Sequence, residues 1–439
     1  MSIDILAVFV VFIMLTATEA ERLIFALIDP LTAVETIPVS EGLGRVLASD
    51  VASGLDFPHW DNSAMDGYAV RSSDFEGLQP QTDGPLQLAV VEEISAGQKP
   101  KRAIGPGQAA RIFTGAMMPE GADTVVMQED TEQQPVDKAE KQTDSPEKAV
   151  YIHKFPTPRA FVRKQGSFRR AGERLLPAGR SLSAAEVALL AAAQQSQISV
   201  FQRPKVAILS TGNELVTPGQ LLAPGQIVDS NQYALAALVA QAGAVPVPLG
   251  IVSDQPETVR AAIATALSRA DMVISSGGVS VGDYDYVEQV LESLGGQLHV
   301  RSVAVKPGKP LTVAGFSRRE VTSLRQVYFG LPGNPASAMV GFWRFVGPAI
   351  AKLSGRVGPW RPEFVWAKAT NELRASGQRE TYLWGQLVLG LQGYEFGRAV
   401  GSHSSGNLVN LADVSGLGVV PQGETLIEPG ARVQVLRVR

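Results

Sequence analysis

A turn rich in glycine and serine joins an apolar strand to an amphipathic helix between Ile274 and Tyr286. Glycine lets the backbone approach an anion closely, and the free N–H groups at a helix start carry partial positive charge, so such a turn favours phosphate. Asp283 and Asp285 lie in the same segment. A carboxylate repels phosphate unless a divalent cation such as Mg²⁺ lies between them. The turn therefore predicts a phosphate and Mg²⁺ site, unless the aspartates only complement the helix dipole.

Two further apolar strands end in polar turns. One lies in Lys205–Leu215 and the other in Tyr328–Ser337, where Asn334 and Pro335 suit the N-cap and the first position of the next helix. Strands and helices alternate throughout residues 203–356, which predicts one doubly wound α/β domain. In an open parallel sheet the turns after the strands meet at the carboxyl edge, where ligands bind.

The composition narrows the chemistry. The 439 residues exceed the size of a single hydrophobic core and predict about two to four domains. A net charge of −4, without a basic stripe, argues against nucleic acid as a partner. The chain has no cysteine, which excludes disulfides and thiolate ligands, and its four scattered histidines lack the spacing of a zinc site. Any bound metal is therefore predicted to be a hard cation with oxygen ligands.

The N-terminal residues form a separate feature. Ile5–Leu15 is apolar but too short to cross a bilayer, and Asp4 precedes it where a secretory segment carries lysine or arginine. A capping box at Thr18–Glu21 is expected to open the first helix. We therefore expect Met14 to be the natural start and residues 1–13 to be an apolar extension of a cytoplasmic protein without membrane contact. The alternative is an anchor that lies on a membrane surface.

The remaining segments predict three smaller parts. Short apolar runs over residues 51–162 predict a β domain, in which the polar segment 130–148 is a solvated hairpin loop. Helical spacing over residues 14–50 and 163–202 predicts a discontinuous helical spacer. Alternating hydrophobic and polar residues over 357–439 predict a C-terminal β barrel, with a sandwich as the alternative. The predicted fold class is α/β multidomain, with a doubly wound α/β domain, small β domains and a helical spacer.

Six short motifs occur in a fixed order along the chain. They read FPHWDNSAMDGYAV (57–70), RIFTGA (111–116), STGNEL (210–215), SSGGVSVG (275–282), KPGKP (306–310) and LPGNP (331–335). In this order they resemble the molybdopterin molybdenumtransferase (MoeA) family, which is related to the E domain of gephyrin. The resemblance covers nearly all of the chain from Met14 onward.

The resemblance implies an activity and its partners. Members of this family are elongated homodimers of four-part subunits, and residues 14–50 and 163–202 would then carry dimer contacts. They take adenylylated molybdopterin and molybdate, insert molybdenum into the dithiolene and release AMP, with Mg²⁺ as the cofactor. A molybdopterin adenylyltransferase would be a further partner. The soft sulfur ligands of molybdenum come from the pterin itself, so the absence of cysteine is no obstacle.

The resemblance also implies the site residues. The catalytic residues would be Asp66, Thr114, Glu214, Asp254, Asp285 and Lys306, with Glu214 and Asp285 as metal ligands. The residues that hold the substrate would be Thr211, Gly212, Ser276, Gly277, Gly278, Ser280, Lys309, Pro332, Gly333, Asn334, Pro335, Ser337 and Ser402.

Several of these residues have a purely structural alternative. Asp254 precedes a helix and could be its N-cap, and Asp66 begins an ordinary Asp-Gly turn pair. Lys306 and Lys309 could flank a solvated turn. Glu214 ends a buried strand, where a carboxylate needs a partner to offset its desolvation, so we expect Glu214 to be paired.

The chain departs from the family pattern at three positions. Phe168 stands where an acidic pair is usual, Trp384 where an arginine is usual and Ser302 where a lysine is usual. The last two positions belong to the family's oxyanion pocket, and losing a charge-assisted hydrogen bond there costs about 1.5 to 3 kcal/mol. Arg301 compensates only if its side chain points inward. The alternatives are therefore a non-catalytic molybdopterin-binding or scaffold paralogue with a decayed oxyanion site and, more distantly, another nucleotide hydrolase.

Overall fold

The structure is a computed structural model that describes residues 14–135, 148–278, 286–317 and 325–438. The chain forms two compact units. The larger unit contains the residues up to 49, residues 178–187 and all residues from 196 onward, whereas the smaller contains residues 50–177 and 188–195. Ser280, Asp283 and Asp285 lie outside the described residues.

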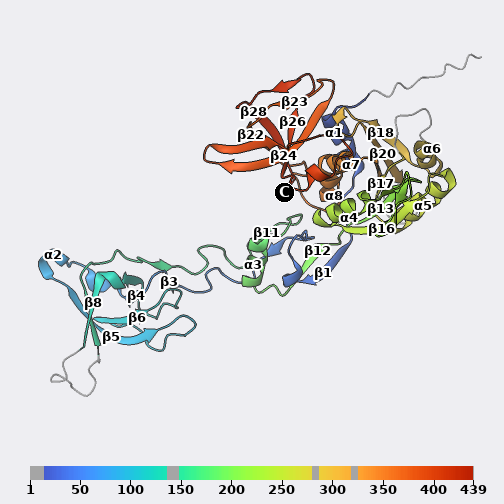
Figure 1. The fold of residues 1–439 in the computed structure, drawn as a ribbon. Coiled ribbons are helices and arrows are strands. Elements are labelled where there is room, and N and C mark those ends of the chain that lie inside the picture. The colour runs from blue at the N-terminus through green and yellow to red at the C-terminus, as the bar shows by residue number, and fades with distance from the viewer. Residues whose placement is uncertain (1–13, 136–147, 279–285, 318–324, 439) are drawn as a thin grey trace, which may run out of the picture. The chain divides into compact units, whose positions relative to one another are not determined.

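The larger unit contains the α/β domain (Figure 1). Its six-stranded sheet has the order β16-β13-β17-β21-β20-β18. Its parallel strands are β16 (Val245–Val252), β13 (Lys205–Thr211), β17 (Met272–Ser276) and β21 (Arg325–Leu331). Two antiparallel strands, β20 (Pro310–Ser317) and β18 (Gln297–Ser302), complete it. The expected parallel sheet is therefore a mixed one, because the links on either side of β20 are too short for a parallel crossover.

Helices cover both faces of this sheet, because successive residues of a strand point to opposite sides. Val206 and Ile208 pack against α4 (Asn231–Gln241), α7 (Pro335–Gly341) and α8 (Gly347–Leu353), and a π-helix (Phe342–Val346) joins α7 to α8. Ala207 and Leu209 pack against α5 (Pro256–Arg269) and α6 (Tyr286–Ser293) on the other face. None of the helices in the described ranges is long and apolar enough to cross a membrane.

The first helix also packs on the α/β domain. α1 (Ala17–Leu27) places Ala20, Ile24 and Leu27 in the same apolar cluster as strand β13. Its capping box uses Thr16 and Glu19, so the expected box at Thr18–Glu21 is wrong by two residues. The physical reason is that Glu21 turns inward and forms ion pairs, so it is not available to the helix start.

The segments expected to form a helical spacer contain strands as well as helix. The helical pattern predicted over residues 14–50 ends at Leu27, and β1 (Val34–Pro38) pairs antiparallel with β12 (Gln197–Phe201). The alanine-rich segment forms α3 (Ala184–Ala192). Two short pairings precede it in the chain: β2 (Val51–Ala52) with β11 (Arg174–Leu176), and β3 (Asn62–Ser63) with β10 (Val162–Arg163).

The smaller unit contains a six-stranded sheet of order β7-β4-β6-β5-β9-β8. Its strands are β4 (Gly67–Val70), β5 (Leu86–Ile94), β6 (Gln108–Ile112), β7 (Thr124–Met127), β8 (Thr131–Pro135) and β9 (Lys148–Ile152). Apolar clusters form on both of its faces, around Tyr68 on one and Ala69 on the other. β8 and β9 pair antiparallel, and the residues that join them, in the predicted hairpin loop, lie outside the described ranges.

The C-terminal domain of the larger unit is a closed β barrel, which confirms the predicted barrel (Figure 1). Its strands pair in the order β24 (Glu380–Gly390), β25 (Gly393–Arg398), β22 (Phe364–Ala369), β28 (Arg432–Arg437) and β26 (Gly416–Val420), and β26 pairs back onto β24. A short strand of the α/β domain, β19 (Val305–Lys306), adds to the barrel at Glu380 and Thr381 of β24.

A buried ion pair joins α1, the π-helix and the barrel. Arg344 and Glu21, each 5% exposed, pair with one another. Arg344 Nε also donates a hydrogen bond of 3.0 Å to the Tyr382 hydroxyl of β24. Arg361 Nε lies 2.8 Å from the second oxygen of Glu21, and the Tyr382 hydroxyl donates to Glu380. The guanidinium of Arg344 therefore connects the π-helix with both α1 and the barrel strand β24.

The charge states of this network follow from its burial. Burial raises the pKa of the Tyr382 hydroxyl well above its usual value, so the tyrosine keeps its proton and donates it to Glu380. Burial opposes the charge of Arg344, but the paired carboxylate of Glu21 outweighs it, and the pKa of the guanidinium is raised. Removing one member of such a buried ion pair costs about 3 to 5 kcal/mol, because the other charge is left unpaired.

Candidate functional site

Three polar turns surround one cavity at the carboxyl edge of the parallel strands. The turns follow β13, β17 and β21, which are neighbours in the sheet. The cavity has a volume of about 680 Å³, and Gly406 and Leu408 of the C-terminal domain also line it. The predicted site residues that line it are Thr211, Glu214, Asp254, Ser276, Gly277, Gly278, Pro332, Gly333, Asn334 and Pro335.

The turn after β17 requires glycine at two positions. Gly277 and Gly278 have φ values of 91° and 70°, in the region that favours glycine. A Cβ atom on Gly277 would lie 2.3 Å from the Thr211 carbonyl oxygen, and one on Gly278 would lie 2.9 Å from Thr211 Oγ1. The close approach of this turn to Thr211 therefore depends on the absence of side chains.

Asp254 holds the turn after β13 in place. Its carboxylate accepts hydrogen bonds from the backbone N–H of Asn213 at 3.3 Å and from the Tyr286 hydroxyl at 3.0 Å. The Asn213 side chain accepts from the backbone N–H of Asp254 at 3.2 Å. The N-cap of α5 is Gln255, without a side-chain cap. The alternative that Asp254 is an N-cap is therefore wrong, because its carboxylate points to the neighbouring turn.

Glu214 lies at the mouth of the cavity rather than in the protein interior. The residue is exposed, so the expectation that desolvation requires a partner for it is wrong. The reason is that β13 ends at Thr211 and the chain turns into solvent before Glu214. The Glu214 carboxylate stays over the turn, where a Cβ on Gly212 would lie 2.7 Å from Oε2.

The cavity suits a hard cation by its charge and its donor atoms. Glu214, Asp229 and Asp254 line it, and its described lining contains no lysine or arginine. Carboxylate oxygens beside a phosphate-binding turn are the ligands that Mg²⁺ uses. The described residues contain no group of three or more acidic, histidine or cysteine residues positioned to hold a metal. A Mg²⁺ ion there would therefore need substrate oxygens or water to complete its ligands.

Asp229 and Asn231 also belong to this cavity, although neither was predicted. They are 2% and 8% exposed and lie at the start of α4. Asn231 Nδ2 donates to Ser276 Oγ at 2.6 Å and to the Gly333 carbonyl at 2.7 Å. In the sequence an Asp-Ser-Asn run before a helix indicates only a helix start, so the contacts with distant turns gave no signal.

Lys306 and Lys309 lie where the α/β domain meets the barrel. Lys306 is exposed and pairs in register with Thr381 of the barrel, so it is part of a strand and not only of a solvated turn. The Lys309 carbonyl accepts a hydrogen bond of 3.0 Å from Val303 N–H. Neither lysine forms an ion pair with any residue in the described ranges. Both remain available to an anion.

Ser337 and Ser402 lie outside the cavity lining. Ser337 is 3% exposed within α7, whereas Ser402 is exposed and its Oγ accepts from Ser404 N–H at 3.2 Å. Ser405, the residue directly after Ser404, accepts a hydrogen bond from Ala336 N–H with its carbonyl. The barrel loop therefore contacts the start of α7, even though neither predicted hydroxyl reaches the cavity in this conformation.

The departures from the family pattern have defined surroundings. Trp384 is fully buried and packs on His403, with ring centroids 4.5 Å apart. Arg301 Nε lies 3.1 Å from Glu288, and its Nη2 lies 3.6 Å from Glu292, so its charge is engaged on α6. The positive charge of Arg301 therefore does not replace the lysine that is missing at Ser302. The Ser302 carbonyl accepts from Leu15 N–H at the end of β18.

Asp66 and Thr114 form a contact within the smaller unit. One Asp66 oxygen accepts hydrogen bonds of 2.7 Å from both the backbone N–H and the hydroxyl of Thr114. The bond from the Thr114 backbone lowers the pKa of Asp66 most, and the hydroxyl bond and the positive charge of Arg111 lower it further below its usual value. Phe168, the third departure, is 68% exposed in the same unit.

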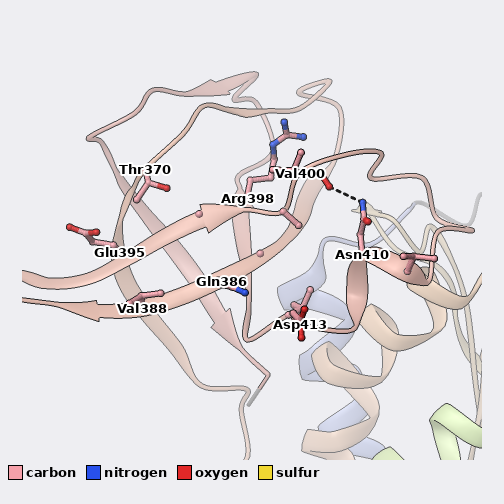
Figure 2. Close-up of a pocket in the computed structure, with 13 residues that line it drawn as sticks. Thr370, Gln386, Val388, Glu395, Arg398, Val400, Asn410 and Asp413 are labelled. Atoms are coloured by element: carbon pink, nitrogen blue, oxygen red, sulfur yellow. Dashed lines mark hydrogen bonds between the residues drawn. The ribbon is translucent and has the colours of Figure 1, made fainter.

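A second cavity lies in the C-terminal domain, between β24, β25 and the segment around Asn410 (Figure 2). It has a volume of about 580 Å³ and contains Arg398, Asp413 and Gln386. Asn410 Nδ2 donates to the Val400 carbonyl at its edge. None of the predicted site residues lines it. The site described above is therefore the cavity at the carboxyl edge of the α/β sheet.

Replacing Thr114 by valine is expected to raise the pKa of Asp66 toward its usual value, because one of two donors to the carboxylate is removed. The native pKa lies below that of the unfolded chain. The contact therefore stabilises the fold above the unfolded pKa of about 3.9 and loses this effect as the pH falls through the native value. A carbon-detected NMR titration of Asp66 measures the change, with Thr82→Val as the control. An unaltered titration curve would mean that the backbone donor alone sets the pKa.

Three family models match the chain in order. They are the MoeA N-terminal region (domain I and II) at residues 15–193, the probable molybdopterin binding domain at residues 207–352 and the MoeA C-terminal region (domain IV) at residues 366–438. The second of these covers the strands and turns that form the cavity.

Named relatives cover almost the whole chain. A molybdopterin molybdenumtransferase of Nostoc sp. is 52% identical over 423 residues, which are 96% of this chain and 93% of the relative. A molybdopterin molybdenumtransferase of Haemophilus influenzae is 34% identical, over 89% of this chain and 91% of the relative. A solved structure of the molybdopterin biosynthesis MoeA protein from Pyrococcus horikosii matches 97% of this chain and 99% of its own, with a TM-score of 0.73 and 30% identity. The chain therefore belongs to the molybdopterin molybdenumtransferase (MoeA) family.

Proposed function

We propose that the chain inserts molybdenum from molybdate into adenylylated molybdopterin and releases AMP. The observation that carries this proposal is the cavity at the carboxyl edge of β13, β17 and β21, which combines a phosphate-type turn with carboxylates. The Nostoc sp. relative that bears the name molybdopterin molybdenumtransferase covers 96% of this chain. A separate molybdopterin adenylyltransferase would supply the adenylylated substrate.

Each part of the cavity has a task in this reaction. The Ser276–Gly278 turn lies against the phosphate, because its two glycines let the chain approach the phosphate closely, while the Gly277 N–H itself donates to the Leu331 carbonyl at 3.1 Å. Asp254 fixes the turn that carries Glu214 through Asn213. Lys306 and Lys309 attract the oxyanion from the barrel side, with Ser337 and Ser402 as further donors once the substrate closes the site.

Glu214 would hold Mg²⁺ together with Asp285, with Asp254 beside them. The ion supplies positive charge that offsets the phosphoanhydride and the charge developing on its leaving oxygen. Without it, the carboxylates of the cavity repel the substrate. The exposure of Glu214 supports this role, because an exposed carboxylate is free to reach a ligand.

A non-catalytic binding or scaffold role is the second candidate. It is favoured by Trp384, which is fully buried against His403 where the family has an arginine, and by Arg301, whose charge is engaged by Glu288. Such a protein would bind adenylylated molybdopterin and release no AMP, with or without molybdate. The assay below therefore separates the two candidates.

Chelation and Glu214→Ala are each expected to lower AMP release by about 100-fold or more. Chelation removes the Mg²⁺ ion whose positive charge offsets the phosphoanhydride, and Glu214→Ala removes a ligand that holds this ion. AMP is measured by chromatography after mixing with adenylylated molybdopterin, Mg²⁺ and molybdate. Glu257→Ala, at an exposed acid in the first turn of α5, is the matched control and should keep full activity. Full release in EDTA, or a fully active Glu214→Ala protein, would remove this acid from the mechanism.

We further propose that the active form is a homodimer in which Asp66 of one subunit serves the Glu214 site of its partner, as the family resemblance implies. Mixing Asp66→Ala chains with Glu214→Ala chains should then restore activity. About half of randomly mixed dimers are heterodimers with one intact site of two, which gives about a quarter of the wild-type rate. Exchange is followed with two affinity tags. Two inactive variants that exchange chains and stay inactive would show that each site lies within one subunit.

A further inference from the structure

Asn231 connects three segments that are distant in the chain. It is the first residue of α4, and both hydrogens of its amide are used on turns that follow other strands. One bond goes to Ser276 Oγ at 2.6 Å, in the turn after β17, and the other goes to the Gly333 carbonyl at 2.7 Å, in the turn after β21. The side chain lines the cavity and is 8% exposed.

The contacts fix the orientation of the amide. The Gly333 carbonyl can only accept a hydrogen bond, so the atom facing it must be the amide nitrogen. Asn231 Oδ1 then finds no hydrogen-bond partner in the described part of the chain. A buried acceptor without a partner is unfavourable. The two donors of Asn231 are therefore kept inward at a cost to stability, which is typical of residues at functional sites.

The bond to Ser276 decides what the serine hydroxyl can do. Ser276 Oγ accepts from Asn231, so its own hydrogen must point elsewhere. Among the described residues, Ser276 Oγ donates only to the Pro332 carbonyl, at 3.5 Å, which is too far for a strong bond. The Ser276 hydroxyl is therefore left as a donor at the cavity, beside the glycines of the same turn.

We propose that Asn231 is a positioning residue for the substrate's phosphate. It holds the Ser276–Gly278 turn against the Pro332–Asn334 turn and makes the Ser276 hydroxyl a donor to a phosphate oxygen. This inference rests on the proposed function for the identity of the substrate, but its role is to orient a phosphate group in any ligand that carries one. Asn231 itself does not touch the reacting atoms.

Calorimetric binding of AMP in the presence of Mg²⁺ tests this role. Asn231→Ala and Ser276→Ala should each weaken AMP binding about tenfold, the effect of losing one good hydrogen bond to a charged group. Because Asn231 acts through Ser276, the double variant should bind AMP about as weakly as either single variant, not about 100-fold more weakly. Tyr233→Ala, an exposed residue on the same turn of α4, is the matched control and should bind like wild type.

Asn231→Asp separates the donors from the shape of the side chain. The aspartate has the same size but cannot donate at neutral pH, so it should lose at least as much affinity as the alanine variant. Asn231→Asp also tests the positioning role if the alanine variant does not fold. Wild-type affinity in Asn231→Asp, or additive effects in the double variant, would overturn the positioning role.

AMP release from adenylylated molybdopterin is measured separately on the same proteins. If wild type binds AMP with the expected dependence on Asn231 and releases none from the substrate, the proposed activity fails and the positioning role stands. If the variants bind AMP as wild type does, the positioning role fails whatever the activity. In an active enzyme, Asn231→Ala should raise KM about tenfold and change kcat much less, because it alters ground-state binding.

Discussion

The buried pair of Arg344 and Glu21 is the interaction on which the larger unit depends. A guanidinium taken out of water must keep its partners, and here they come from α1 and from the barrel strand β24. The pair therefore selects one arrangement of three elements whose apolar surfaces would otherwise pack in several ways. Arg344 lies in the π-helix between α7 and α8, and such helices are frequent at functional sites.

This arrangement reaches the site through the loop before β20. The barrel strand that contains Tyr382 also contains Glu380 and Thr381, which pair with Val305 and Lys306 of the short strand β19. The Lys306 cation is consequently held by the barrel, although it belongs to the α/β domain. On the far side of the cavity, Asn231 and Asp254 join the turns of neighbouring strands through side-chain bonds. The turns at the cavity are thus fixed from outside by polar contacts.

The sequence predicted the features that depend on local patterns. Ser-Gly-Gly or Leu-Pro-Gly-Asn-Pro at the end of an apolar strand predicts a turn, and parallel strands bring such turns to one edge of the sheet. The cavity lined by Thr211, Ser276 and Gly333 follows from that rule. The C-terminal barrel likewise follows from the alternation of apolar and polar residues.

Features that depend on distant partners could not be predicted in this way. Asn231 looks like an ordinary helix start, and its contacts come from turns 45 and 102 residues away. Glu214 was expected to be desolvated because the strand before it is buried, yet the chain leaves the core within three residues. Arg301 and Trp384 were assessed by charge alone, whereas their environment is set by α6 and by the ring of His403.

The central claim is that Arg344 fixes the barrel, and with it the Lys306 strand, on the α/β domain. Hydrogen–deuterium exchange of Arg344→Met measures it most directly, with the exposed Arg356→Met as the control. The account predicts that amides of residues 303–306 and 380–383 exchange at least about tenfold faster than in wild type, while the central strands β13 and β17 keep their protection. Unchanged protection of β19 and β24 in the Arg344 variant would contradict the account, because the barrel would then be held without the buried pair.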